Sequence, residues 1–250
     1  MEITPVQEKE LPKVADPVID EMTRAGLHFG HKTSKTHPKM KPYIAGVRNT
    51  IHVLDLEKTK EKLDLALQFI SGLIQGGKVI LLVGTKIQLK GLVKQTAESC
   101  GLPYVSERWI GGTFTNFDTI LKRVSTMLDL EKKRETGELD KYTKKEKLRI
   151  DGEIKELEEK YGGLRTLAKL PDAVFICDLD QNQLALKEAK RKGIAIIAVC
   201  DTNIDPTPID YLIPANDDAM SSAAYVLDKV RETILKAKPQ PITTNDQSQS

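Results

Sequence analysis

A basic segment near the amino end holds the side chains best suited to binding a polyanion. Residues 24–48 contain no Asp or Glu, although the whole chain is almost balanced, with 38 basic and 36 acidic residues. Lys and Arg neutralise phosphates, and the rings of Phe, Tyr and His can stack on unpaired bases. The segment therefore predicts an RNA-binding surface. Its candidate residues are Arg24, His28, Phe29, His31, Lys32, Lys35, His37, Lys39, Lys41, Tyr43 and Arg48.

Two other interpretations of this segment stay open. It can be a solvated basic loop without a ligand, because most charge runs are simply surface. It can also be a metal site, since His28 and His31 are three residues apart and His37 is near. No Cys or carboxylate is adjacent to them in the sequence, and the lysines would repel a cation. We therefore expect no metal and no cofactor.

A second candidate segment, SERWIGGTFTNF, spans residues 106–117 and holds the only tryptophan of the chain. Arg108 suits a backbone phosphate, Trp109 suits stacking, and the pair Gly111 and Gly112 allows close approach to a sugar-phosphate chain. The alternative is a structural turn with Trp109 packed in the core. The two interpretations are compatible.

Acidic residues follow the strand-like runs in the second half of the chain. Asp178 follows one run, Asp201 follows the next, and Asp217 lies further on. This order resembles that of magnesium-dependent aspartyl phosphotransferases, with Asp178 and Asp217 as the candidate catalytic residues. No Lys lies between residue 202 and Asp217 to balance a phosphate, and Asp commonly caps helices and forms turns at such places. The phosphotransferase is therefore the alternative function.

The segment VGTKIQLKG, residues 83–91, has a superficial likeness to a phosphate-binding loop. It lacks the spacing of the P-loop, so we do not expect a nucleotide there.

Composition limits the class of protein. A formal net charge of +2 and a sequence pI near 8.3 exclude a general polycation, so the positive charge is local. No run approaches the roughly 20 apolar residues of a membrane helix, and the first residues lack the apolar stretch of a secretory signal. The chain has only three cysteines, Cys100, Cys177 and Cys200. A small and odd number of cysteines favours buried free thiols over disulfides, and with it a cytoplasmic location.

Strand-like and helix-like segments alternate along most of the chain, which predicts an α/β fold with a doubly wound parallel sheet. The apolar runs at 51–54, 78–84, 173–178 and 194–201 are predicted to be strands covered on both faces. Helical periodicity covers 63–74, 89–100 and 226–234. Gly101 and Gly193 each follow the last periodic residue of a helix and are predicted to be left-handed caps.

Residues 117–164 interrupt this alternation with two charged helical stretches. The sequence between them has the capping-box spacing at Thr143 and Glu146. An inserted antiparallel helical hairpin is the simplest structure with these parts, and its far end is expected to be mobile until something holds it. Two ordinary surface helices are the alternative. The predicted seams are Phe117, Leu121, Val124 and Leu128, then Ile150, Ile154, Leu157, Tyr161 and Leu164.

These segments give a domain plan. The α/β domain is predicted at 18–117 and 164–236, with the inserted hairpin at 118–163. Residues 1–17 and 237–250 are polar and rich in proline or charge, so both tails are expected to be disordered.

Several long motifs occur in an order typical of one family. They are GLHFGHKT, HPKMKPYIAGVRNTIHVLDLEKT, VGTK, RWIGGTFTNF, KLPDAVFICD, EAKRKGIAIIAVCDTNIDP and IPANDDA. From about Met22 to Ile234 the chain resembles the bacterial small-subunit ribosomal protein S-two family. The chain departs from that pattern at Thr36 and His37, where the family usually has Trp and Asn, and at Ala215, where it usually has Gly.

The resemblance implies a non-catalytic structural component of the small ribosomal subunit in the cytoplasm. It implies a flavodoxin-like α/β domain with an inserted coiled-coil hairpin, which binds small-subunit ribosomal RNA at the junction of head and body. It also implies support for attachment of the S-one ribosomal protein, with no membrane and no small-molecule substrate as partners. We predict that RNA binding uses charge and shape without a reaction, through His28, Phe29, His31, Lys32, Lys39, Lys41, Tyr43, Arg48, Asn49, Arg108, Trp109, Thr113 and Asn116.

Overall fold

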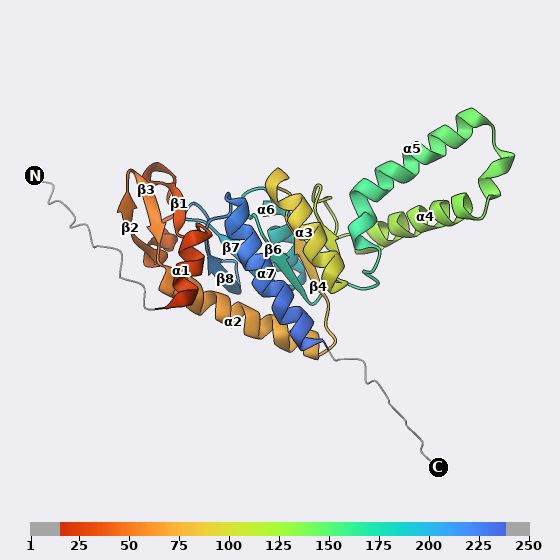
Figure 1. Cartoon of the computed structure of the whole chain (residues 1–250). Helices are drawn as coiled ribbons and strands as arrows, with labels where there is room; N and C mark the ends of the chain where they lie inside the picture. The colour runs from red at the N-terminus through yellow and green to blue at the C-terminus, as the bar shows by residue number, and fades with distance from the viewer. Residues whose placement is uncertain (1–15, 239–250) are drawn as a thin grey trace, which may run out of the picture.

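The computed structural model describes residues 16–238 of the 250-residue chain (Figure 1). The expected disorder of the tails falls largely on residues 1–15 and 239–250, which lie outside the described residues. Asp16 and Pro17 are described: the Asp16 carboxylate accepts a hydrogen bond from the Val18 amide and caps α1 (Pro17–Arg24). No helix in the described part of the chain has the length and hydropathy needed to span a membrane.

A five-stranded parallel sheet forms the centre of the α/β body. Its strands, in spatial order, are β5 (Tyr104–Val105), β4 (Ile80–Val83), β6 (Ala173–Ile176), β7 (Ala195–Cys200) and β8 (Tyr211–Pro214). Three of them confirm the strands predicted at 78–84, 173–178 and 194–201. Counted along the chain within this sheet, the order is 2-1-3-4-5.

Helices cover both faces of this sheet, so the strand side chains alternate between two cores. Leu82 and Phe175 point into the first core, whereas Val83 and Ile176 point into the second. The first core is covered by α2 (Leu56–Gln75), α3 (Ile87–Cys100) and α7 (Met220–Ala237), which confirm the predicted helices. The second core is covered by α6 (Gln183–Lys192) and the start of α4 (Phe117–Glu135). The three cysteines are buried free thiols, as predicted.

Left-handed glycines end two of these helices. Gly101 has φ 59° and Gly193 has φ 68°, which L side chains rarely adopt, so both predicted caps are confirmed.

A small antiparallel sheet corrects part of the sequence analysis. Its order is β1 (Phe29–Lys32), β3 (Ile51–Leu54) and β2 (Ile44–Arg48). The run at 51–54 is therefore not a strand of the parallel sheet, and three of its four residues are only half-buried. The basic segment is not an irregular loop, because it forms β1, β2 and the short helices η1 (Thr33–Lys35) and η2 (Pro38–Tyr43).

The turn between β2 and β3 explains why sequence reasoning missed this hairpin. Asn49 and Thr50 have φ values of 48° and 66°, as in the two-residue turns that suit antiparallel strands. The second position of such a turn usually holds Gly, and a β-branched Thr gives no sequence signal for it.

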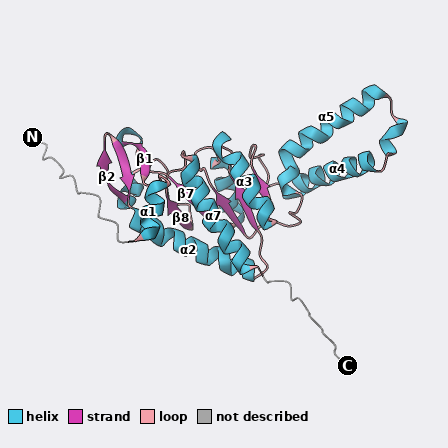
Figure 2. Ribbon diagram, viewed as in Figure 1, coloured by secondary structure: helices cyan, strands magenta, loops and turns pink. Residues whose placement is uncertain are grey.

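Helices α4 and α5 (Lys144–Tyr161) run side by side in opposite directions and project from the end of the body distant from the small sheet (Figures 1 and 2). The short helix η3 (Glu138–Lys141) lies between them, and the predicted capping box of Thr143 and Glu146 is present. The mobility of the far end stays a prediction.

The packing face of α4 differs from the predicted seam. Ile120, Val124 and Met127 are buried, whereas Leu128 is 40% exposed. The start of α4 packs into the second core as well as against α5. The buried face of α4 is therefore rotated relative to the face that would contact α5 alone. On α5 only Ile154, near the middle of the helix, is buried, and Leu139 of η3 is buried at the far end of the pair.

Two contacts hold the segment that follows α5, where the chain re-enters the α/β body. Arg165 donates to both carboxylate oxygens of Glu131, at 2.9 and 2.7 Å, and lies 2.8 Å from Glu158, so it joins α4 to α5. Gly163, in η4 (Gly162–Leu164), lies against the edge strand β5. A Cβ atom at Gly163 would lie 2.2 Å from the Tyr104 carbonyl oxygen, closer than any real contact.

We expect Gly163→Ala to destabilise the protein by about 2 kcal/mol or more, because the added methyl overlaps backbone that cannot move freely. Gly152→Ala is the matched control, since a Cβ at this helical position of α5 meets nothing within 4 Å. The free energy of unfolding of that control should rise by roughly 0.5–1 kcal/mol, because alanine favours the helix more than glycine does. Urea unfolding monitored by circular dichroism measures both, and equal stability of the two variants would contradict the close approach.

Candidate nucleic-acid interface

The small antiparallel sheet and the short helices beside it bring most of the predicted RNA-binding residues together. Phe29 is 47% exposed, and His28 and Tyr43 are half-buried. The His28 and Phe29 rings lie 4.0 Å apart between centroids, which gives the exposed ring support from below. The exposed polar and charged members are Lys32, Lys35, Lys39, Lys41, Arg48 and Asn49. We call this set, with Phe29, the basic sheet face.

Most of its charge is not neutralised within the protein. Lys39 lies 3.5 Å from Asp205 and donates to the Thr207 hydroxyl. Among the described residues, no carboxylate pairs with Lys32, Lys41 or Arg48. The basic sheet face therefore keeps the capacity to bind phosphates.

His31 lies beneath this face rather than on it. Its Nδ1 lies 2.8 Å from Asp201 and its Nε2 lies 3.5 Å from Asp218, while its backbone amide donates to Thr202. The hydrogen bond to Asp201 raises the pKa of His31, against the opposing effect of burial. His31 thus attaches β1 to the carboxyl end of β7, and its RNA contact stays a prediction.

A group of possible metal ligands surrounds His31. One ligand atom each from His31, Asp201, Asp217 and Asp218 lies within 4.8 Å of the others. The argument that no carboxylate lies near the histidines is therefore wrong for His31, because the fold brings the carboxylates from distant segments. An imidazole nitrogen and three carboxylates are a donor set that a divalent cation can use. The expectation of no metal stays a prediction.

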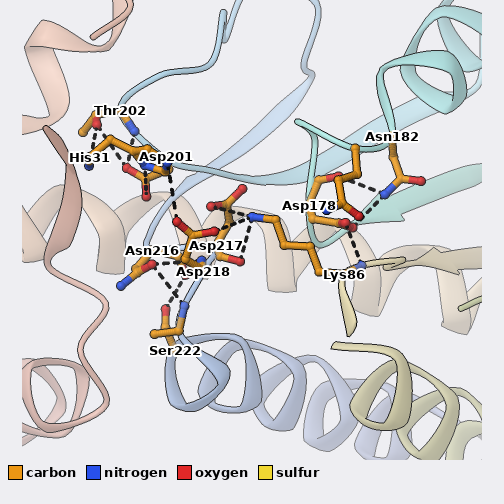
Figure 3. Close-up of polar contacts among 12 residues, drawn as sticks. His31, Lys86, Asp178, Asn182, Asp201, Thr202, Asn216, Asp217, Asp218 and Ser222 are labelled. Atoms are coloured by element: carbon orange, nitrogen blue, oxygen red, sulfur yellow. Dashed lines mark hydrogen bonds and ion pairs between the residues drawn. The ribbon is translucent and has the colours of Figure 1, made fainter. Parts of the chain in front are cut away.

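A buried lysine lies beside these carboxylates (Figure 3). The Lys86 ammonium is 3.0 Å from Asp217 and 2.8 Å from Asp218, and its side chain is 9% exposed. Burial acts to lower the pKa of Lys86, but the two carboxylates outweigh it and raise the pKa. Burial raises the pKa of Asp217 to about 6. A lysine therefore does lie beside Asp217, but it comes from the residue before α3 and not from the segment between residue 202 and Asp217.

The amino end of α3, where a nucleotide phosphate would bind in many α/β proteins, is filled by the protein's own Asp178 (Figure 3). Asp178 accepts hydrogen bonds from the Thr85 amide at 3.2 Å and the Lys86 amide at 3.1 Å. The Asn182 side-chain amide donates to it at 2.7 Å. A buried carboxylate at this place repels phosphate, which agrees with the expectation of no nucleotide at 83–91.

The second candidate segment divides into buried and exposed residues. Trp109 is 6% exposed and packs edge to face on Phe114, with ring centroids 4.8 Å apart. Thr113 is 1% exposed, and its hydroxyl donates to the Ile110 carbonyl. Their burial supports the alternative of a structural turn at both positions, and the RNA contacts of Trp109 and Thr113 stay a prediction. Arg108 and Asn116 are exposed.

The structure does not join these two candidate regions into one patch. Arg108 and Asn116 belong to the turn before α4, whereas the basic sheet face lies at the opposite end of the body (Figure 1). Sequence reasoning also missed Glu188 of α6, whose buried carboxylate binds the turn at 109–116. One Glu in a charged helix gives no sequence signal for such a role.

Together these features define an α/β protein whose buried carboxylates hold its own backbone, with a group of exposed, unpaired basic residues on and beside its small sheet. The family profile described as Ribosomal protein S2 matches residues 22–237. A protein of Roseiflexus sp. (strain RS-1), named small ribosomal subunit protein uS2, is 44% identical over 217 residues. That match covers 87% of this chain and 83% of the relative. The chain belongs to the ribosomal protein S2 family.

Membership of this family settles the choice between a structural protein and an enzyme. The family consists of structural, non-enzymatic ribosomal proteins that serve in translation. The alternative of a magnesium-dependent aspartyl phosphotransferase is therefore wrong. Asp178, its candidate nucleophile, is already engaged by the Thr85 and Lys86 amides.

Asp178 makes a testable contribution to stability. Burial raises its pKa to about 6, against the hydrogen bonds from Thr85 and Lys86, while the ordinary value is 3.8. Between pH 3.8 and about 6, Asp178 keeps its proton in the folded protein but has lost it in the unfolded chain. The contribution of Asp178 to the free energy of unfolding therefore falls as pH rises through this range. A pKa difference of roughly two units corresponds to a loss of at most about 3 kcal/mol in the free energy of unfolding.

We therefore expect wild-type protein to lose stability relative to Asp178→Asn as pH rises through this range, with no further change above it. Denaturant unfolding at a series of pH values measures the difference, and groups shared by both proteins cancel. A difference independent of pH would contradict the raised pKa.

Proposed function

We propose that this protein is a structural constituent of the small ribosomal subunit that binds small-subunit ribosomal RNA through its basic sheet face. The observation that carries the proposal is the exposure of Lys32 and Arg48 on the small sheet and of Lys41 on the adjoining η2, with no carboxylate paired to them among the described residues. Each of these side chains can replace the counterions of an RNA phosphate, so binding is expected to weaken with salt.

A rigid platform makes this face specific for a folded RNA. The His37 amide donates to the Thr202 carbonyl at 2.8 Å, and Gly30 lies so close to Thr202 that a Cβ would be 2.7 Å from its methyl group. These contacts fix the small sheet on the end of β7. The charged side chains are therefore presented in a constant arrangement, which lowers the entropy lost on docking.

Stacking is the second component of the proposed interface. Phe29 exposes nearly half of its side chain beside the charged residues, with His28 behind it. An exposed aromatic ring next to lysines suits an unpaired base at the surface of a folded RNA. Tyr43 is half-buried and packs against the second core, so it offers only part of its ring to an RNA. Arg108 and Asn116 form a separate candidate contact at the base of α4.

Family membership supports the finer parts of the proposal. The strand order 2-1-3-4-5 is that of flavodoxin-like sheets, so we assign the body to that architecture, with α4 and α5 as an inserted antiparallel coiled-coil hairpin. The resemblance to the family supports a place at the junction of head and body. It also supports a role in attachment of the S-one ribosomal protein.

Neutralising two unpaired charges tests the proposed interface. We expect Lys41→Gln with Arg48→Gln to weaken binding to small-subunit ribosomal RNA. The slope of log affinity against log salt should fall by roughly 1.4 to 1.8, the value for two lost phosphate contacts. Both side chains are exposed, so the free energy of unfolding should hardly change.

The matched control is Lys229→Gln with Lys236→Gln, which removes the same charge from α7. Filter binding across a salt series and cosedimentation with reconstituted small subunits measure both variants. Equal salt slopes for the two double variants would refute the basic sheet face as the RNA-binding site.

A further inference from the structure

We propose that Glu188 is a positioning residue, whose carboxylate fixes the turn at 109–116 and thereby the direction in which α4 and α5 leave the body. The geometric part of this proposal concerns the protein alone. Its importance for the ribosome rests on the proposed function, since a hairpin pointed elsewhere would not meet its partners in the subunit.

The contacts of Glu188 form an anion site filled from within the protein. One carboxylate oxygen accepts from the Gly112 amide at 2.8 Å and the Trp109 indole at 3.4 Å. The other accepts from the Phe114 amide at 2.9 Å, and from the Thr115 amide and hydroxyl at 3.1 and 3.2 Å. Backbone amides converging from one turn make a concave site that favours an anion.

The charge of Glu188 has no cationic partner among the described residues, and its side chain is only 5% exposed. A buried carboxylate without a counterion is tolerated only when hydrogen bonds replace the water that it has lost. Burial acts to raise the pKa of Glu188, but the donors from Gly112, Phe114 and Thr115 outweigh it and keep the pKa below its usual value. The turn and the carboxylate therefore stabilise each other.

The turn is joined directly to the helix pair. α4 begins at Phe117, two residues after Thr115, so no flexible linker separates the bound turn from the helix. Asn116, the residue that precedes α4, makes no capping hydrogen bond with its side chain to the helix backbone. The turn therefore leads directly into the helix, and the start of the helix also packs through Ile120 in the second core.

The other side of the contact is rigid. α6 carries Glu188 and buries Ala185, Leu186 and Ala189 in the second core. A carboxylate on such a helix is a fixed point of the body. The Glu188 contact therefore connects the body to the first residues of the insertion, whereas Arg165 connects only the two helices of the pair to each other.

Chemical rescue separates a positioning role of the charge from simple filling of space. Glu188→Ala removes the atoms that acetate contains, a methyl-like carbon and a carboxylate, and alanine favours the helical conformation of α6. Acetate can bind the vacated donors, whereas acetamide has the same shape without the charge. The matched control is Glu153→Ala, an exposed residue of α5.

The direction of the helix pair is measured by electron–electron distance spectroscopy between spin labels at Gln68→Cys on α2 and Lys133→Cys on α4. Both positions are exposed, and the native cysteines are buried. We expect Glu188→Ala to broaden and shift the distance distribution and acetate to restore it, with no effect of acetamide or of Glu153→Ala. Exchange of the Gly112, Phe114 and Thr115 amides should rise roughly tenfold to a hundredfold, as charge-assisted hydrogen bonds are lost.

An unchanged distribution in folded Glu188→Ala, or equal rescue by acetamide, would overturn the proposal. If Glu188→Ala does not fold, Glu188→Gln replaces it, because its side chain has the same size but presents an NH2 group to the amide donors. A wild-type distribution and wild-type exchange in that variant would also overturn it. These measurements need no RNA, so their failure is distinct from a failure of the Lys41 and Arg48 test.

Discussion

The proposed site depends on how the small antiparallel sheet is attached to the end of β7. Like charges gathered on one face repel each other, so a basic surface of this kind needs an anchor that does not neutralise it. The structure uses His31 with Asp201, and backbone contacts with Thr202, at positions beneath the exposed face. The carboxylates therefore act on a histidine inside the protein and leave Lys32, Lys41 and Arg48 to the exterior.

Elsewhere in the body, carboxylates occupy places where an external anion would bind. Asp178 holds the amides at the start of α3, and Glu188 holds those of the turn before α4. Both groups of amides would otherwise be available to a phosphate. Because both are filled from within, these two groups of amides are not available to an external phosphate. This arrangement gives a physical reason why an α/β fold of this kind acts as a scaffold and not as a nucleotide-binding enzyme.

The sequence predicted what depends on local periodicity and composition. The strands at 78–84, 173–178 and 194–201, the left-handed glycines and the capping box at Thr143 were all recognisable. Pairing between distant segments could not be recognised from the sequence. The run at 51–54 has the composition of a strand buried on both faces, but it pairs with β1 and β2. In the site, charge identified the lysines, whereas the burial of Trp109 and Thr113 and the roles of His31, Lys86 and Glu188 depend on partners far along the chain.

If the proposed interface is correct, ribosomal RNA covers the basic sheet face in the assembled subunit. The most direct measurement is the reactivity of each lysine toward an amine-modifying reagent, read by mass spectrometry in the free protein and in purified small subunits. We expect Lys32, Lys39 and Lys41 to react readily in the free protein and to become protected in the subunit. Full reactivity of these lysines in the subunit would contradict it.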